Sequence, residues 1–392
     1  MKKIAVFGST GSVGSQALDI ARVYSDKIAI TCLSAHSDAE KLARQANEFK
    51  PQYLALNDIN KMDRLKDLLT YNITEIFTGD NAMLNAISKV NCDMAVLAVS
   101  GISGLLPFAK CLEKHLAVAL ANKESIVCGG ELIQKLIKQS ETVVLPVDSE
   151  HSAIFQCLGN SYNTENVENL WITASGGPFL NKTKQEIDNA SVEEALAHPN
   201  WNMGIKISID SASLANKGLE IIEAHYLYNI EPEHIKTVIQ PKSLIHSMVE
   251  FKDATVLAQF APVDMRLPLQ RAILYPEVAE LKVNRPLNFW DLGNIEFIKP
   301  DFDKFPCLKL AYEAIDKNLT DVFSMANEEA VSLFYKGKIS FGQISLIIDS
   351  AMHNFKNKTI HSINDIIELN ERVKDYIRNN LQGQVYSDFE EE

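Results

Sequence analysis

The chain has 392 residues, of which 46% are hydrophobic and 23% charged, and its formal net charge is −13. This length predicts two or three domains with ordinary globular cores. The negative charge argues against nucleic acid or an anionic membrane as a partner, and no apolar run approaches a membrane span in length. The six cysteines lack metal-binding or redox spacing, so we expect free thiols and a cytoplasmic location.

A short strand at residues 3–7 leads into a glycine-rich turn at 8–14 and an amphipathic helix that ends near Tyr24. This order is typical of dinucleotide binding, because glycines let the backbone approach a pyrophosphate at the helix N-terminus. The spacing is GxxGxxG, a variant of the commoner GxGxxG. A glycine-rich turn without a ligand is the alternative interpretation.

More apolar strands follow, with helical stretches between them. We predict strands at 28–34, 53–56, 94–99, 117–120 and 143–147, and helices that include 38–48, 104–114 and 131–138. Apolar strands that alternate with helices indicate a parallel sheet covered on both faces. Residues 1–148 are therefore expected to form a doubly wound, Rossmann-like domain, with a flavodoxin-like domain as the runner-up.

The second predicted strand ends in His36, Ser37 and Asp38. In dinucleotide-binding folds an acid near this point favours NAD, whereas a cation favours NADP. Asp38 can bind a ribose, but capping of the next helix is the preferred interpretation. His36, Ser37 and Lys41 can instead meet a 2′-phosphate, so the residues alone leave the cofactor open.

The apolar run at 143–147 ends in Asp148, Ser149 and Glu150. If the strand continued, its period of two would direct both carboxylates to one side, where they would suit Mg²⁺ or Mn²⁺. Taken alone, these two carboxylates fit a solvated acidic loop better. The stretch 121–124, with Asn122, Lys123 and Glu124, also closes a strand and is expected to face the same edge of the sheet, although an ordinary turn with Asn122 as helix cap fits it too.

Three later segments carry polar groups suited to a small anion. A strand at 170–174 opens into Ser175 and two glycines, which form a backbone nest, and the loop 197–204 has the composition of a lid, although its His198 alone fits an incidental loop histidine better. Asn216, Lys217 and Glu220 share one helix face, so they can bind phosphate and supply a third carboxylate. A capped surface helix is the alternative.

The remaining chain is expected to form a second sheet and a helical bundle. Strands are predicted at 237–239, 243–250 and 255–260, and helices at 307–317, 321–336, 341–355 and 362–380. The predicted domains are 1–148 for the nucleotide, 149–275 for catalysis and dimerisation, a linker at 276–300, and a C-terminal helical domain at 301–392.

Six motifs resemble, in the same order, those of the 1-deoxy-D-xylulose 5-phosphate reductoisomerase family. They lie at 8–14, 121–124, 147–151, 175–179, 198–201 and 216–220, so the resemblance runs nearly end to end. It implies an α/β fold with a Rossmann-like N-terminal sheet, a central α+β catalytic domain and a C-terminal helical bundle. It also implies a homodimer that rearranges a sugar phosphate and reduces it with NADPH to 2-C-methyl-D-erythritol 4-phosphate, in non-mevalonate isoprenoid synthesis.

The resemblance assigns roles to particular residues. It implies a divalent cation (Mg²⁺ or Mn²⁺, with Co²⁺ as a further candidate) on Asp148, Glu150 and Glu220, and these three act in catalysis with Lys123 and His198. The implied substrate-binding residues are Lys123, Ser149, Glu150, Ser175, His198, Trp201, Ser211, Asn216, Lys217 and Glu220. The implied NADPH-binding residues are Thr10, Gly11, Ser12, Val13, Asn122, Glu124 and Gly204, with His36, Ser37 and Asp38 at the 2′-phosphate.

The chain departs from the family's usual residues at a few positions, and two other functions are compatible with its sequence. The family usually has glycine, a variable polar residue and asparagine where this chain has His36, Ser37 and Asp38, and Val263 replaces a proline. A metal-assisted NAD(P)-dependent dehydrogenase of another phosphorylated or hydroxy-acid substrate is the alternative enzyme. A catalytically inactive nucleotide sensor is the alternative from another class.

Overall fold

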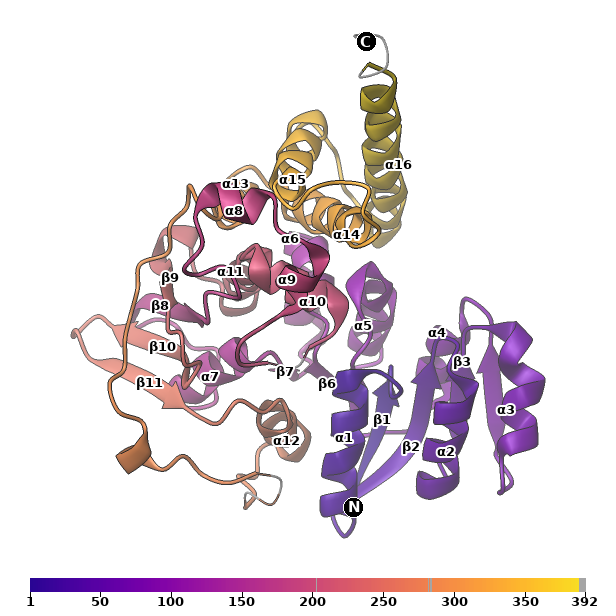
Figure 1. Ribbon diagram of the computed structural model, residues 1–392. Coiled ribbons are helices and arrows are strands. Elements are labelled where there is room, and N and C mark those ends of the chain that lie inside the picture. The colour runs from indigo at the N-terminus through magenta and orange to yellow at the C-terminus, as the bar shows by residue number, and fades with distance from the viewer. Residues whose placement is uncertain (202, 281, 283, 388–392) are drawn as a thin grey trace. The chain divides into compact units, whose positions relative to one another are not determined.

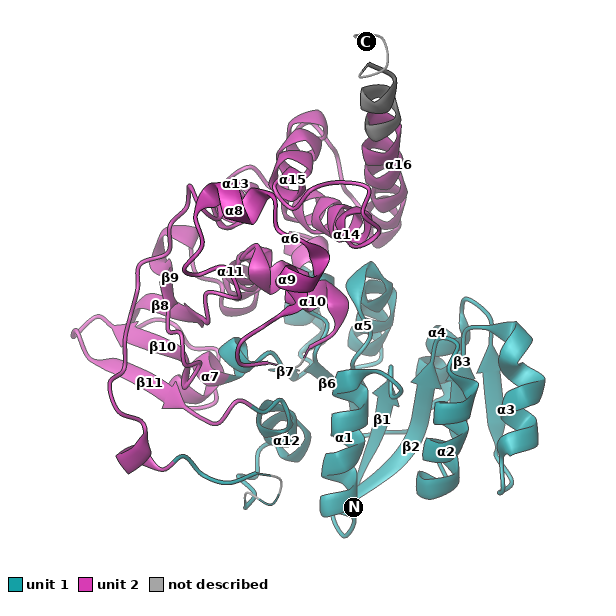
Figure 2. Ribbon diagram, viewed as in Figure 1, with its two compact units in different colours: residues 1–125, 133–152, 264–287 teal, residues 126–132, 153–263, 288–392 magenta. Residues whose placement is uncertain are grey.

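The computed structural model describes residues 1–201, 203–280, 282 and 284–387 (Figure 1). The chain forms two compact units (Figure 2): unit 1 comprises residues 1–125, 133–152 and 264–287, and unit 2 comprises 126–132, 153–263 and 288–392. The predicted assignment of cofactor, catalytic and dimerisation roles to consecutive domains stays a prediction. The last five residues of the predicted C-terminal domain, 388–392, lie outside the described residues.

Unit 1 is built on a seven-stranded parallel sheet in the order β4-β3-β2-β1-β5-β6-β7. Its strands are β1 (Lys2–Phe7), β2 (Ile28–Ala35), β3 (Tyr53–Leu56), β4 (Glu75–Thr78), β5 (Met94–Leu97), β6 (Ala117–Leu120) and β7 (Val144–Pro146). The central strand β1 pairs on both sides, with Ile4 opposite Ile30 and Met94. The strand order reverses direction between β1 and β5, which is the Rossmann arrangement and not the flavodoxin one.

The helices of this unit follow the predicted βα alternation. They are α1 (Ser12–Val23), α2 (Ala39–Phe49), α3 (Met62–Leu68), α4 (Ala82–Lys89) and α5 (Leu105–Glu113). Helix α12 (Arg266–Leu274) also belongs to this unit but lies outside that alternation. Two further helices cross the boundary between the units in sequence, α6 (Lys123–Ser140) and α7 (Ser149–Cys157). Inside α6, Gly130 has a φ of 48° and a ψ of −134°, so the helix breaks there.

Two elements of unit 1 escaped prediction. Strand β4 is short, lies at the sheet edge and contains no buried residue, so it lacks the apolar run that marks the other strands. Helix α12 follows the residues of the second sheet in sequence but packs against α1. Its apolar face is covered by unit 1, although the chain reaches it more than a hundred residues after β7.

Unit 2 contains a four-stranded mixed sheet in the order β11-β10-β8-β9. Its strands are β8 (Val167–Ala174), β9 (Ile235–Ile239), β10 (Ile245–Phe251) and β11 (Val256–Phe260). Strand β8 runs parallel to β9 and antiparallel to β10, and β11 lies at an exposed edge. Helix α11 contacts β8 and β9 and is almost entirely buried, because it lies between this sheet and α13.

The other helices of unit 2 are α8 (Lys184–Asp188), α9 (Val192–Leu196), α10 (Ile205–Ala212), α11 (Ala215–Tyr228), α13 (Pro306–Asp316), α14 (Thr320–Tyr335), α15 (Gln343–Asn354) and α16 (Ile363–Ser387). The last four form the helical region that their amphipathic periodicity predicts. The predicted fold class is therefore confirmed. No helix within the described residues combines the length and hydropathy needed to cross a membrane.

Candidate active site

The glycine turn of unit 1 owes its shape to close backbone contacts. Gly8 has a φ of +81°, and a Cβ there would lie 2.5 Å from the carbonyl oxygen of Ala98. A Cβ on Gly14 would lie 2.2 Å from the carbonyl oxygen of Gly8, so α1 can pack against the turn only without a side chain. Gly11 is the N-cap of α1 and offers no side-chain cap. The helix N-terminus is thus available to an anion, as the motif predicts.

Side chains from β2 and α2 hold this turn in place. The Ser34 hydroxyl accepts a 2.8 Å hydrogen bond from the amide of Gly8. The buried Gln45 amide donates to the carbonyl oxygen of Ser9 at 2.9 Å and accepts from its hydroxyl at 2.8 Å. Lys41 donates from Nζ to the carbonyl oxygen of Thr10 at 2.8 Å. A cation therefore lies beside the turn, where a phosphate of a dinucleotide is expected.

The structure confirms capping as one role of Asp38. Its carboxylate accepts a 2.9 Å hydrogen bond from the amide of Lys41 and caps α2. His36 and Ser37 precede it and are exposed, as Asp38 is. Asn122 likewise caps α6: it is fully buried, accepts from the amide of Ser125 at 3.1 Å and donates to the carbonyl oxygen of Gly101 at 2.9 Å.

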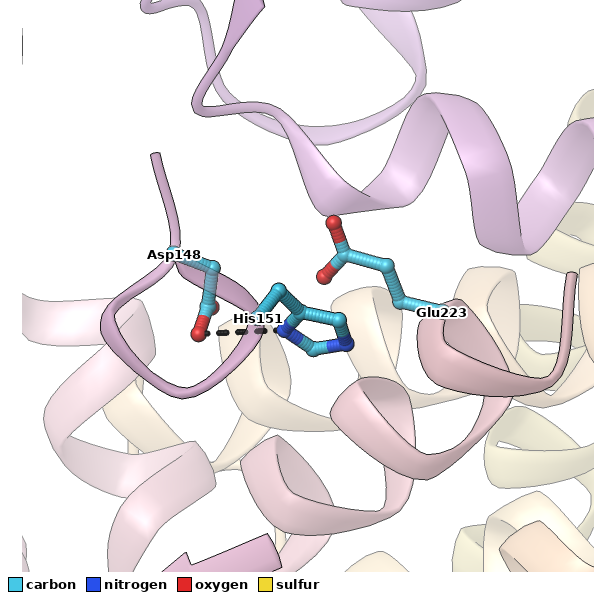
Figure 3. Close-up of side chains that lie close together, drawn as sticks. All are labelled: Asp148, His151 and Glu223. Carbon is cyan, nitrogen blue, oxygen red and sulfur yellow. Dashed lines mark ion pairs between the residues drawn. The ribbon is translucent and has the colours of Figure 1, made fainter. Parts of the chain in front are cut away.

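Three polar side chains meet near the end of β7. Lys123 Nζ lies 2.5 Å from Asp148 Oδ2. His151 Nδ1 lies 3.3 Å from Asp148 Oδ1, and Figure 3 shows this contact. All three are buried or nearly so. Burial acts to raise the pKa of Asp148, but the charges and hydrogen bonds of Lys123 and His151 outweigh it and hold that pKa well below its usual range. Asp148 is therefore ionised at neutral pH.

The period-two interpretation of Asp148 and Glu150 is wrong. Strand β7 ends at Pro146 and α7 begins at Ser149, so Glu150 lies in the first turn of a helix. Asp148 precedes that helix and accepts a 3.2 Å hydrogen bond from the amide of Glu150. The Ser149 hydroxyl donates to Glu150 Oε2 at 2.5 Å. The turn into α7, and not strand alternation, places these carboxylates.

In unit 2, the predicted face of α11 forms as expected. Glu220 is 1% exposed, and its two carboxylate oxygens accept hydrogen bonds from the Asn216 amide (2.5 Å) and from the Lys217 ammonium. A Cβ on Gly177 would lie 2.8 Å from the carbonyl oxygen of Ser211. The Ser175–Gly177 turn thus packs directly against the end of α10, so that two segments more than 30 positions apart in sequence meet.

The loop after α9 contacts the same turn through His198. His198 Nδ1 accepts from the backbone amides of Asn200 (3.1 Å) and Trp201 (3.0 Å), so this nitrogen carries no proton. Burial lowers the pKa of His198, which favours the neutral ring. The remaining nitrogen, Nε2, then carries the proton and donates to Ser175 Oγ at 3.0 Å.

This tautomer fixes the Ser175 hydroxyl as well. Its oxygen accepts from His198 Nε2 and also from the amide of Gly177 at 3.1 Å. Because both acceptor positions are used, the hydroxyl proton of Ser175 is left to donate. The loop is held further by the Asn200 amide, which donates to the carbonyl oxygen of Pro241 at 2.7 Å and to Ser243 Oγ at 2.9 Å.

Several polar residues acquire a place that their sequence context did not predict. His151 follows Asp148 by three positions, the spacing of neighbours on a helix, but this spacing alone predicts no role for it. Gln45 resembles any polar residue of an amphipathic helix. The ring of His246 lies 6.2 Å from that of Trp201, and no local pattern in β10 signals this pairing.

A doubly wound sheet with an open glycine turn, together with buried carboxylate, lysine and hydroxyl groups, defines a nucleotide-dependent oxidoreductase of the α/β class. Family models support a narrower assignment. Residues 4–130 match "1-deoxy-D-xylulose 5-phosphate reductoisomerase", 144–228 match its C-terminal domain, and 260–376 match the "DXP reductoisomerase C-terminal domain".

Full-length relatives agree. The chain is 44% identical to the 1-deoxy-D-xylulose 5-phosphate reductoisomerase of Clostridium kluyveri over 96% of this chain and 99% of the relative. A crystal structure of DOX-P reductoisomerase with NADPH, fosmidomycin and magnesium matches with a TM-score of 0.92 and 34% identity, over 97% of this chain and 98% of the other. The Zymomonas mobilis enzyme with NADPH matches with a TM-score of 0.91 at 34% identity, over 97% and 99%. The chain belongs to the 1-deoxy-D-xylulose 5-phosphate reductoisomerase family.

Proposed function

We propose how this chain carries out the reaction of its family. The chain is an NADPH-dependent oxidoreductase that rearranges 1-deoxy-D-xylulose 5-phosphate and reduces the product to 2-C-methyl-D-erythritol 4-phosphate, in the non-mevalonate isoprenoid pathway. The observation that carries the residue assignments is the buried face of α11, where Asn216 and Lys217 bond to Glu220. Two residues proposed to bind phosphate and one carboxylate proposed to bind the cation thus lie within about one helical turn.

The cation ligands we propose are Asp148, Glu150 and Glu220. Their fit rests on chemistry: all three offer carboxylate oxygens, and Asp148 is held ionised, which suits Mg²⁺ or Mn²⁺, and also Co²⁺. A family member binds magnesium in its crystal structure. The chemistry supplied at this site is polarisation of the substrate ketone and stabilisation of the developing oxyanion.

Around these ligands, we assign Lys123 and Ser149 to the reacting end of the substrate. Lys123 Nζ bonds to Asp148, and its ammonium group has the charge and donors that suit a substrate oxygen. Ser149 donates to Glu150 and orients that carboxylate. His151 contacts the Asp148 oxygen that Lys123 does not, and so helps to orient the Asp148 carboxylate.

NADPH fits the glycine turn. We assign its pyrophosphate to Thr10, Gly11, Ser12 and Val13 at the N-terminus of α1, where glycines keep the backbone accessible. The 2′-phosphate is assigned to His36 and Ser37 beside Asp38, with Lys41 supplying positive charge. Asn122, Glu124 and Gly204 are assigned to the rest of the cofactor. The chemistry supplied by the cofactor is hydride transfer to the rearranged aldehyde.

The phosphate of the substrate is assigned to Ser175, Ser211, Asn216 and Lys217. The fixed hydroxyl of Ser175 donates to a phosphate oxygen, and Lys217 adds a charge-assisted hydrogen bond. His198 and Trp201 belong to the loop that covers the substrate, excluding water from the reacting aldehyde. Binding energy from the phosphate then orients the reacting end.

A homodimer is proposed from the apolar edge of the unit 2 sheet. Val256 and Leu257 on β11 are 48% and 47% exposed, and Trp290 is 96% exposed. The Phe260 and Phe289 rings lie 5.7 Å apart and join the edge strand to the same segment. Such an apolar edge suits a second copy of the chain. A cytoplasmic location is proposed because five cysteines are free thiols, as is usual in a reducing compartment: Cys32, Cys92, Cys111, Cys157 and Cys307.

The test is oxidation of NADPH by the full chain. We expect it to require both 1-deoxy-D-xylulose 5-phosphate and Mg²⁺ or Mn²⁺, with 2-C-methyl-D-erythritol 4-phosphate as the product identified by mass spectrometry. The dephosphorylated ketose should react far more slowly. Equal rates with and without the phosphate would refute the phosphate assignments and favour a dehydrogenase of another substrate.

A further inference from the structure

Asp210 lies at the end of α10, directly before Ser211, but takes no part in the site described above. It is 1% exposed, although it is a carboxylate. Its Oδ2 accepts from Lys206 Nζ at 2.7 Å, one turn earlier on the same helix. Its Oδ1 accepts from the Asn327 amide at 2.8 Å, and Asn327 lies on α14, 117 residues later in the sequence.

Asn327 is an unusual residue for the middle of a buried helix face. It is fully buried, and its amide oxygen has no hydrogen-bond partner within the described part of the chain. Burying such an oxygen is unfavourable, so packing alone does not account for an asparagine here. The amide nitrogen bonds to Asp210, and this bond is what the side chain contributes.

The backbone of Asp210 is also bonded to the turn that joins the two proposed phosphate-binding segments. Ser213 donates from its hydroxyl to the carbonyl oxygen of Asp210 at 3.2 Å, and its Oγ accepts from the amide of Ala215 at 3.3 Å. Between them Leu214 adopts a left-handed φ of 57°, which a branched residue rarely does. The turn between α10 and α11 is thus strained and needs its neighbours to hold it.

We infer that Asp210 and Asn327 form a brace that positions the phosphate-binding groups on either side of the turn at 213–214. The brace fixes the end of α10, which carries Ser211, and through Ser213 the start of α11, which carries Asn216 and Lys217. Neither brace residue is among those that we assign to the substrate. Both are positioning residues for the proposed phosphate site, so the inference rests on the proposed function.

A second buried contact on α14 provides a matched control. Asp321 and Lys358 form an ion pair of 2.9 Å with side chains only 6% and 8% exposed. This pair joins α14 to the segment between α15 and α16, and not to α10. Breaking it removes a buried polar contact of the same helix without loosening the turn at 213–214.

The test compares Asn327→Leu with Lys358→Met in the full chain with Mg²⁺ and NADPH. We expect Asn327→Leu to raise the KM for 1-deoxy-D-xylulose 5-phosphate and the calorimetric Kd for inorganic phosphate by about tenfold, and to lower kcat, because misplaced anchors lose both binding and orientation. NADPH affinity should stay within about twofold. Lys358→Met should lower the melting temperature while leaving KM and the phosphate Kd unchanged.

A swap of the two side chains supplies the rescue. Asp210→Asn combined with Asn327→Asp restores a hydrogen bond in the reverse direction, so it should recover part of the phosphate affinity that each single substitution loses. Equal effects of Asn327→Leu and Lys358→Met on KM and phosphate Kd would overturn the brace. If the wild type failed to turn over the ketose phosphate, the proposed function would fall, while the phosphate titrations would still decide on the brace.

Discussion

The glycine turn of unit 1 and the α10–α11 junction of unit 2 are both assigned to phosphate groups, but they are built in opposite ways. The turn excludes side chains: a Cβ on Gly14 would lie 2.2 Å from a backbone oxygen. The junction instead collects charged and polar side chains, with Lys217 and Asn216 on a buried carboxylate. Backbone amides suit a cofactor that always presents the same pyrophosphate, whereas a lysine adds the charge needed by a small substrate.

The difference predicts how each region fails when altered. The turn should fail through its backbone, so that small side chains are damaging and charge changes matter little. The junction should fail through loss of individual donors, each with a separate cost to substrate binding. The protein carries a net charge of −13, so a substrate dianion depends on those local donors.

The largest effect is expected for Glu220→Gln. The amide has the shape of the carboxylate but lacks its charge, so we expect weaker Mn²⁺ binding and a kcat reduced by at least about 100-fold. NADPH affinity should hardly change, because the glycine turn is unaltered. Calorimetry with Mn²⁺ and steady-state kinetics measure the two effects, and an unchanged Mn²⁺ affinity would remove Glu220 from the proposed ligands.

Lys217→Ala comes next. A charge-assisted hydrogen bond contributes about 1.5–3 kcal/mol, so kcat/KM should fall by at least about tenfold. Both kcat and KM should change, since the phosphate also orients the reacting end. Lys309→Ala, an exposed lysine on α13, is the control and should behave as wild type. The ratio of kcat/KM between wild type and Lys217→Ala should be smaller with 1-deoxy-D-xylulose than with its 5-phosphate. Equal ratios for the two substrates would contradict the assignment of Lys217 to the phosphate.

The two glycines at the start of α1 separate folding from cofactor binding. Gly14→Ala brings a methyl group against the backbone and should lower the melting temperature together with NADPH affinity. Gly11→Ala is less crowded, since its Cβ would lie 3.3 Å from the nearest atom, the carbonyl oxygen of Gly8. We expect it to keep its melting temperature but to bind NADPH about fivefold more weakly. Equal NADPH affinity in Gly11→Ala and wild type would argue against close backbone approach at this position.

How far the sequence predicts the molecule depends on the range of each signal. Apolar strands, the glycine spacing and the i, i+3 and i, i+4 neighbours on α11 are local patterns, and the structure confirms each of them. The exposed edge strand β4 lacks such a pattern. Helix α12 is covered by a unit to which the chain returns, which periodicity does not encode.

The site shows the same division. Lys217 and Glu220 lie within one turn and could be paired from their spacing. By contrast, His198 meets Ser175 across 23 residues, and Asp210 meets Asn327 across 117. Long-range pairs of this kind form only when the elements pack, so only the family resemblance could point to His198, and nothing in the sequence pointed to Asn327.

The smallest expected effect concerns pH. Because burial lowers the pKa of His198 from its ordinary value of about 6.5, the neutral ring is favoured while His198 is bonded to Ser175. As the pH falls below about 6.5, a His198 ring that has left Ser175 takes up a proton more readily than a ring bonded to it. Acid pH therefore weakens the contact between His198 and Ser175, and the contact is complete above about pH 7. Protonation would also place a hydrogen on Nδ1, facing the amides of Asn200 and Trp201.

His198→Gln should isolate this contribution, since glutamine can still donate to Ser175 but does not titrate in this range. We expect the wild type to exceed the variant in kcat/KM by about threefold at pH 8, the worth of a well-placed neutral hydrogen bond. The advantage should disappear towards pH 5. Taking the ratio of the two enzymes at each pH cancels the titration of the substrate phosphate. A ratio of the two kcat/KM values that stays constant from pH 5 to 8 would show that the contact with Ser175 does not depend on the charge of His198.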